Sequence, residues 1–236
     1  MKRFLSLFLV SILLLAGCSK KKSEKPVEPY VQEREGIWVS ADADAYVAIF
    51  GNGVIMTFDQ QTLREGRWTE VEGGIAGTFT GGVVYGASQW EYHAEEYACA
   101  YVYDAEAGKL IAGDEVEYLP AVAAADFRAV GEHIDVYEEA GSRAWMSQMD
   151  MNMGAGTVLE LWNGLEQQLF SYLMQTQADP EKLQEEENAW LAEYDKELDA
   201  VREENAGGSI APLAVASKGS AMLQERVEEL LGMIKE

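Results

Sequence analysis

The sequence predicts an α+β protein: an N-terminal antiparallel β-meander, closed as a small barrel or a sandwich, followed by a C-terminal helical hairpin or bundle. Residues 36–119 contain 13 aromatic residues and 12 glycines among short β-branched runs, which is typical of many short strands joined by turns. From about residue 121 onward, apolar residues recur at helical spacing instead. The chain has 236 residues, of which 48% are hydrophobic, so it can form a sizeable core.

The first segment is a predicted signal peptide over residues 1–17. Lys2 and Arg3 precede an apolar run that is too short to span a bilayer comfortably, and Leu15-Ala16-Gly17-Cys18 follows. This tetrapeptide resembles the lipobox of bacterial lipoproteins, which implies cleavage before Cys18 and acylation of its thiol. The alternative is an ordinary signal peptide that leaves Cys18 as a free thiol. Residues 18–35 are expected to form the lipidated linker.

The lipobox resemblance implies attachment to the bacterial cell envelope, with the membrane as a partner through Cys18. Ser19 resembles the outer-membrane sorting pattern, so the expected location is the outer membrane, facing the periplasm, in a cell with two membranes. Otherwise it is the outer face of the cytoplasmic membrane. Loss of residues 1–17 removes two basic residues and changes the formal net charge from −23 to −25.

The predicted β domain covers residues 36–120. Its clearest strands are expected at residues 36–39, 46–50, 54–58 and 97–103. Gly51-Asn52-Gly53 predicts a tight hairpin between the second and third of these runs. Further turns are expected at Gly73-Gly74, Gly81-Gly82 and residues 107–109.

Residues 121–146 are expected to be a connector with some helix near 137–149, and residues 147–236 a helical domain. One helix is predicted through 158–173, and Asp179-Pro180 should cap and begin the next. Asn205 to Gly208 should end that second helix. Residues 209–218, which include Pro212, are expected to be a loop before a final helix over 222–234.

The composition excludes several functional classes. The 41 acidic residues outnumber the 18 basic ones, which argues against a nucleic-acid-binding protein. His93 and His133 have no spacing suited to zinc, and the motifs of phosphate loops, nucleophile elbows and metalloproteases are absent from the sequence. We therefore expect no catalytic residue, metal or cofactor. Cys99 lies in an aromatic strand, where a thiol is usually a small buried hydrophobe.

The helical half resembles the lysozyme inhibitor LprI-like family over about residues 147–232. The similarity is carried by the segments 147–155, 183–198 and 207–213, followed by Met222 and Arg226. The residues matching the family's pattern, expected to be structural, are Asn152, Trp190, Asp195, Gly207, Gly208, Pro212 and Arg226. The family commonly has cysteines where this chain has Gly154, Leu198 and approximately Lys218. The resemblance therefore implies that packing replaces a disulfide here.

Together with the lipobox and the absence of catalytic motifs, the resemblance implies a non-enzymatic lipoprotein that binds and inhibits lysozyme. A strongly acidic chain would attract a basic partner of this kind by electrostatic steering. The predicted contacts lie on the second helix and are Glu185, Glu186, Glu187 and Glu193, all expected on its exposed side. Two alternatives remain. One is a structural or assembly lipoprotein that binds another envelope component through the β domain, and the other is a lipocalin-like module that binds a small ligand.

Overall fold

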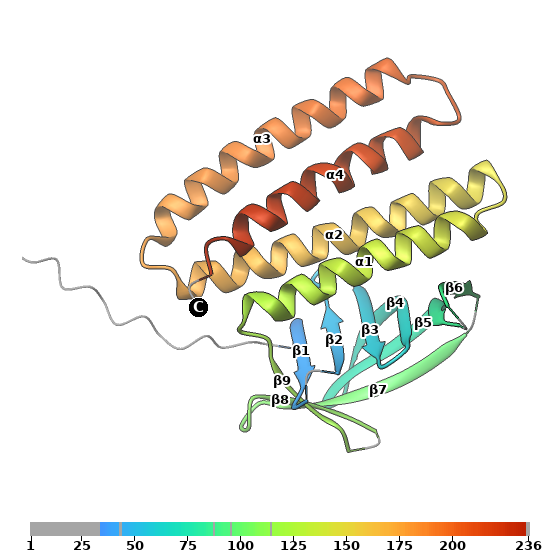
Figure 1. Ribbon diagram of the computed structural model, residues 1–236. Helices are drawn as coiled ribbons and strands as arrows, with labels where there is room; N and C mark the ends of the chain where they lie inside the picture. The colour runs from blue at the N-terminus through green and yellow to red at the C-terminus, as the bar shows by residue number, and fades with distance from the viewer. Residues whose placement is uncertain (1–33, 43, 87, 95, 114, 235–236) are drawn as a thin grey trace, which may run out of the picture.

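A computed structural model describes residues 34–234 apart from 43, 87, 95 and 114. Within this part of the chain, an antiparallel β-barrel precedes four long helices, which lie together on one side of it (Figure 1). The predicted α+β class is confirmed. The predicted signal peptide, Cys18 and all but the last two residues of the linker lie outside the described residues.

The barrel consists of eight antiparallel strands, with a ninth short strand at one edge. The strands are β1 (Gly36–Ser40), β2 (Ala45–Ile49), β3 (Val54–Asp59), β4 (Thr62–Val71), β5 (Gly74–Tyr85), β6 (Trp90–His93), β7 (Tyr97–Asp104), β8 (Lys109–Ala112) and β9 (Glu117–Pro120). Consecutive strands pair as a meander except for β6 and β7, and pairing of β1 with β9 closes the ring. β6 and β7 pair with different ends of the same edge of β5. The meander is therefore a barrel, not a sandwich.

The strands β1 to β3 are almost continuously apolar because both of their faces are buried. Along β2, Val47 and Ile49 point into the barrel, whereas Tyr46 and Ala48 point outward and pack against the helices. The same alternation in β3 places Ile55 inside and Met56 outside. Strands buried on both faces lose the alternation of apolar and polar residues that marks a half-exposed strand.

Three of the four predicted turns are confirmed. Gly53, Gly73 and Gly108 have φ values of +84°, +77° and +63° at the β2–β3, β4–β5 and β7–β8 turns. The turn predicted at Gly81-Gly82 is wrong, because both residues lie inside β5. A Cβ at Gly81 would come within 2.5 Å of the Tyr92 hydroxyl. These glycines therefore permit close packing within the sheet, not a reversal of the chain.

The helices are α1 (Ala124–Ala144), α2 (Gln148–Thr176), α3 (Pro180–Glu204) and α4 (Ala211–Leu231). In Figure 1, α1 lies nearest the barrel and α3 farthest from it, with α2 and α4 between them. Asp179 caps α3 as predicted, since its carboxylate accepts a hydrogen bond from the Lys182 amide at 3.2 Å. None of the helices in the described part of the chain has the length and apolarity needed to cross a membrane.

Two segments of the helical half contain more helix than expected. Residues 121–146, expected to be a connector with some helix near 137–149, are mostly the 21-residue helix α1; 137–144 and 148–149 are helical as expected, and the chain breaks at 145–147. The loop predicted at 209–218 is also largely helical, because α4 begins at Ala211. Pro212 occupies the first turn of α4, where its missing N–H has no intrahelical partner to lose.

One hydrophobic core joins the barrel to the helices. Phe127 and Ile134 of α1 and Leu161 and Leu165 of α2 belong to the same buried cluster as Phe50 of the barrel. Phe50 lies against α2 at Gly164, where a Cβ would come within 2.4 Å of its ring. The barrel interior forms a second, separate cluster around Trp38, Ile55 and Phe79.

Candidate functional site

Several residues of the predicted family pattern meet at one end of the helical bundle. Asn152, near the start of α2, donates a hydrogen bond from Nδ2 to the Ser209 carbonyl in the α3–α4 loop at 3.3 Å. Gly207 in that loop has φ +78°, and Pro212 follows in the first turn of α4. The α1–α2 turn lies at this same end (Figure 1). Residues far apart in the sequence are therefore tied into one local structure.

A groove lies beside this hydrogen bond, between α2, the end of α3 and the start of α4. Its volume is about 420 Å³. We call it the end groove. It is lined by Asn152, Gly156, Leu159, Arg202, Ala211, Pro212, Val215 and Ala216. The charge of Arg202 is paired with Asp199 at 2.5 Å. The rest of the groove offers a mainly apolar surface.

Exposed apolar side chains lie at this same end of the bundle. Met146, Met149 and Met153 are 87%, 71% and 66% exposed, and Ile210 is 51% exposed. We call these four residues the methionine patch. Met149 and Met153 are one helical turn apart on α2 and flank Asn152. Clustered exposed apolar residues mark interaction surfaces, and methionine adapts readily to the shape of a partner.

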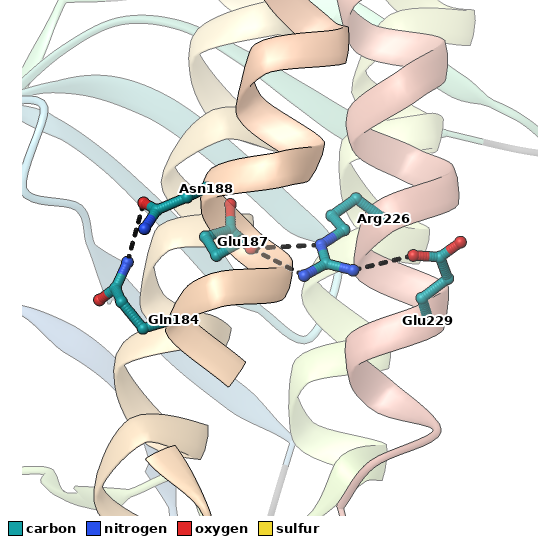
Figure 2. A network of polar contacts seen from close by, with 5 residues as sticks. All are labelled: Gln184, Glu187, Asn188, Arg226 and Glu229. Carbon is teal, nitrogen blue, oxygen red and sulfur yellow. Dashed lines mark hydrogen bonds and ion pairs between the residues drawn. The ribbon is translucent and has the colours of Figure 1, made fainter. Parts of the chain in front are cut away.

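A buried ion pair lies deeper in the bundle, between α3 and α4. Arg226 donates to Glu187 Oε2 from Nη2 at 2.8 Å and from Nε at 3.3 Å, and its Nη1 donates to Glu229 at 2.9 Å. Figure 2 shows Glu187 turned toward Arg226, whereas Gln184 and Asn188 pair with each other on another side of α3. The side chains of Glu187 and Arg226 are only 5% and 6% exposed. The expectation that Glu187 is exposed is therefore wrong.

A second buried carboxyl group lies beside this pair. Glu166 of α2 is 4% exposed, and its Oε1 atom has no hydrogen-bond partner among the described residues. Burial, followed by the adjacent charge of Glu187, raises the pKa of Glu166 to about 8. Glu166 is therefore largely protonated at neutral pH and can share a hydrogen bond with the Glu187 carboxylate. Two acids and one guanidinium thus fit in the core without an excess of negative charge.

The other predicted positions lie on or near the surface of α3. Glu185, Glu186 and Glu193 are exposed as expected, and Asp195, a residue of the family pattern, is exposed as well. Glu186 pairs with Lys182 at 3.1 Å and Glu193 with Lys196 at 2.8 Å. Trp190 is half-buried. Its ring stacks on Tyr194 with centroids 5.0 Å apart and lies 5.7 Å from the Arg226 guanidinium carbon.

Sequence reasoning missed Glu166 and the methionine patch. The buried acids could have been recognised from their spacing relative to the apolar residues of their helices. Glu187 follows Leu183 by four residues and precedes Trp190 by three, and Glu166 stands in the same relation to Trp162 and Leu169. Both acids thus occupy the apolar stripe of their helix. The methionine patch had no comparable signal, because an apolar residue on a helix is normally assigned to the core.

The remaining chemistry-bearing residues do not gather into a reactive site. His133 of α1 stacks on Phe58 of the barrel with ring centroids 4.0 Å apart, and burial lowers its pKa. Burial raises the pKa of the Cys99 thiol, which makes it a poor nucleophile. Across the described residues, no three histidine, cysteine or acidic side chains are grouped so that they could hold a metal ion.

Comparison with known proteins finds a family match for the helical region. Residues 139–230 match the sequence model of the family described as Lysozyme inhibitor LprI. The match runs from the end of α1 through almost all of α4, so it contains the end groove, the methionine patch and the Glu187–Arg226 pair but none of the barrel. The predicted resemblance is thus confirmed. Neither the curated proteins nor the solved structures contained a match to this chain.

Proposed function

We propose that this protein is a non-enzymatic lipoprotein that binds and inhibits lysozyme through its helical region. The observation that carries this proposal is the match of residues 139–230 to a family described as lysozyme inhibitors. We also propose that acylation of Cys18 anchors the chain in the bacterial envelope, facing outward from the membrane. The linker would then hold the folded part near the surface at which a lysozyme acts.

The charge of the chain supports a basic partner. The formal net charge is −23, and α3 alone carries ten acidic residues against three basic ones. Glu185, Asp195, Glu203 and Glu204 on this helix form no ion pair with any described residue. C-type lysozymes are strongly basic, so this surface would accelerate their association, more so at low salt than at high salt.

We assign the direct contact to the methionine patch and the end groove, not to the middle of α3. Protein interfaces concentrate their binding free energy in an apolar centre surrounded by a polar rim. The patch and groove supply such a centre, and Glu203 and Glu204, next to Arg202 at the end of α3, supply an acidic rim. Glu185, Glu186 and Glu193 would then contribute to steering, and Glu187 to the fold alone.

A lysozyme turbidity assay with residues 19–236 tests this proposal. We expect inhibition at micromolar protein in low salt that weakens as salt is added. The double variant Met149→Asp/Met153→Asp should raise the inhibitory concentration at least tenfold, because it places charge in the apolar centre of the interface. The matched control Val102→Asp/Leu119→Asp adds the same charge at exposed apolar positions of the barrel and should inhibit like the parent.

The lysozyme function and the assigned contact surface can be refuted by different results. Absence of inhibition by the parent chain at low salt would refute the lysozyme function. Inhibition that both double variants retain equally would leave that function standing and remove the methionine patch as its contact surface.

A further inference from the structure

The barrel interior is filled at one end and hollow at the other. Ile49 and Ile55, which pair beside the β2–β3 turn, are fully buried in the filled end together with Trp38. Toward the opposite mouth, a cavity of about 400 Å³ lies between β2–β4 on one side and β7–β9 on the other. We call it the barrel cup. Its volume lies in the range of small-molecule sites.

Arg64 places a cation in this cup. The residue belongs to β4 and pairs with Gly82 of β5, where a Cβ would come within 3.4 Å of Arg64 Cγ. The missing side chain at Gly82 therefore gives the arginine room. The Arg64 side chain is 22% exposed, and its guanidinium carbon lies 4.8 Å above the centre of the Tyr97 ring. Of the three basic residues in the described strands, it is the one that lines the cup.

The guanidinium group retains donors for a ligand. Its nearest acid is Asp59 at the rim, with 3.6 Å between Nη1 and Oδ2, which is beyond a direct hydrogen bond. By comparison, Arg67 and Lys109 form close ion pairs with Glu160 and Glu117 elsewhere on the surface. A planar guanidinium stacked on an aromatic ring is oriented to bind a carboxylate, sulfonate or phosphate through two parallel hydrogen bonds.

Aromatic rings form much of the remaining wall. Tyr97, Tyr101 and Tyr118 line the cup, and the last two meet edge to face with centroids 6.5 Å apart. Burial raises the pKa values of Tyr101 and of the nearby Cys99 thiol. Both groups therefore stay neutral at physiological pH and do not repel an anion. Ring faces of this kind favour flat ligands.

From these contacts we infer that the barrel cup binds a small organic anion that carries a flat ring. The anionic group pairs with the Arg64 guanidinium, and the ring lies among Tyr97, Tyr101 and Tyr118. This binding site is independent of the lysozyme proposal, because the barrel lies outside the segment that matches the inhibitor family.

The probe for this inference is 8-anilino-1-naphthalenesulfonate, a flat aromatic sulfonate whose fluorescence rises on binding. We expect saturable binding to one site that depends on Arg64, with Arg64→Gln weakening the affinity at least tenfold. Arg67→Gln is the matched control, because it removes an arginine from the same strand but outside the cup. The uncharged analogue N-phenyl-1-naphthylamine should bind weakly and equally to the parent and to both variants.

A second variant covers the case in which Arg64→Gln does not fold, which thermal unfolding of each protein would reveal. Thr57→Phe, on the wall of the cup, should block the sulfonate while Arg64 is retained. The inference is overturned if the folded parent does not bind the sulfonate. It is equally overturned if folded Arg64→Gln binds like Arg67→Gln, or if Thr57→Phe binds like the parent.

Discussion

The ion pair of Glu187 and Arg226 shows how a single charged residue can be misassigned. In a run of three glutamates, Glu187 resembles its neighbours Glu185 and Glu186, which are exposed. Its helical position is nonetheless that of a core residue, and Arg226 on α4 makes its burial tolerable through two hydrogen bonds. Removing one partner of such a pair typically costs ~3–5 kcal/mol because the other charge stays buried.

Glu166 leads to a prediction about pH. Its pKa is about 8 in the folded protein against an ordinary value of 4.5, so the folded state retains a proton that the unfolded state loses. The stability contributed by this proton is complete below pH 4.5 and is lost as the pH rises to about 8. Glu166→Gln keeps a neutral hydrogen-bond donor and removes the titration.

Relative to the parent, Glu166→Gln should therefore gain stability between pH 5 and pH 8, at up to ~1.4 kcal/mol per pH unit. Urea unfolding of both proteins at the two pH values measures this difference. Glu185→Gln on the exposed face of the same bundle is the control and should show no such gain. If the difference in unfolding free energy between the parent and Glu166→Gln is the same at pH 5 and at pH 8, the buried, protonated state of Glu166 is contradicted.

Among the elements, α2 packs against the other three helices and against β3, and its glycines differ according to what they face. At Gly154 a Cβ would come within 2.0 Å of the Trp145 ring, so the cysteine common in the family could not fit here without moving that ring. Leu198 of α3 stands where the family commonly has a second cysteine, and it is buried, with 4% of its surface exposed. This arrangement supports the view that packing replaces a disulfide in this chain.

Two glycines of α2 provide a matched pair of substitutions. Gly164→Ala should destabilise the protein by ~1–3 kcal/mol, because the new methyl group overlaps the buried Phe50 ring. Gly156→Ala meets no atom within 4 Å and should stabilise the same helix by up to ~1 kcal/mol. Chemical denaturation measures both changes. Equal effects of the two substitutions would show that α2 does not press on the barrel at Gly164.

At the scale of the whole molecule, the barrel and the helices are coupled through their shared core. The outward side chains of β2 and β3 would be exposed without α1 and α2, and the inner faces of these helices would be exposed without the barrel. We therefore expect the two regions to unfold together as one cooperative unit.

A substitution that creates a cavity inside the barrel tests whether the helices unfold together with it. Ile55→Ala removes a fully buried side chain from the barrel cluster and should cost ~2–5 kcal/mol. The helical circular dichroism signal and tryptophan fluorescence should shift to the same lower unfolding midpoint. A helical signal that keeps the parent midpoint would mean that the helices are stable without the barrel.

Much of this architecture could be read from local patterns. Apolar runs identified the first three strands, with the glycine turn at residues 51–53 between the second and third, the Asp179 cap located the start of α3, and helical spacing indicated α2 and the final helix. These features depend on interactions between residues close in the chain, so the sequence reports them directly. The helix α1 was missed because three of its seven buried residues, Gly131, Ala140 and Gly141, are small and give a weak apolar pattern.

The tertiary structure decided the features that depend on distant partners. It closed the meander into a barrel through the pairing of β1 with β9, buried Glu187 against Arg226, and left the methionine patch uncovered. It also hollowed one end of the barrel around Arg64. Helical or strand periodicity can indicate which face of an element is covered, but the residues that cover or pair with a side chain lie on elements tens of residues away, and periodicity does not identify them.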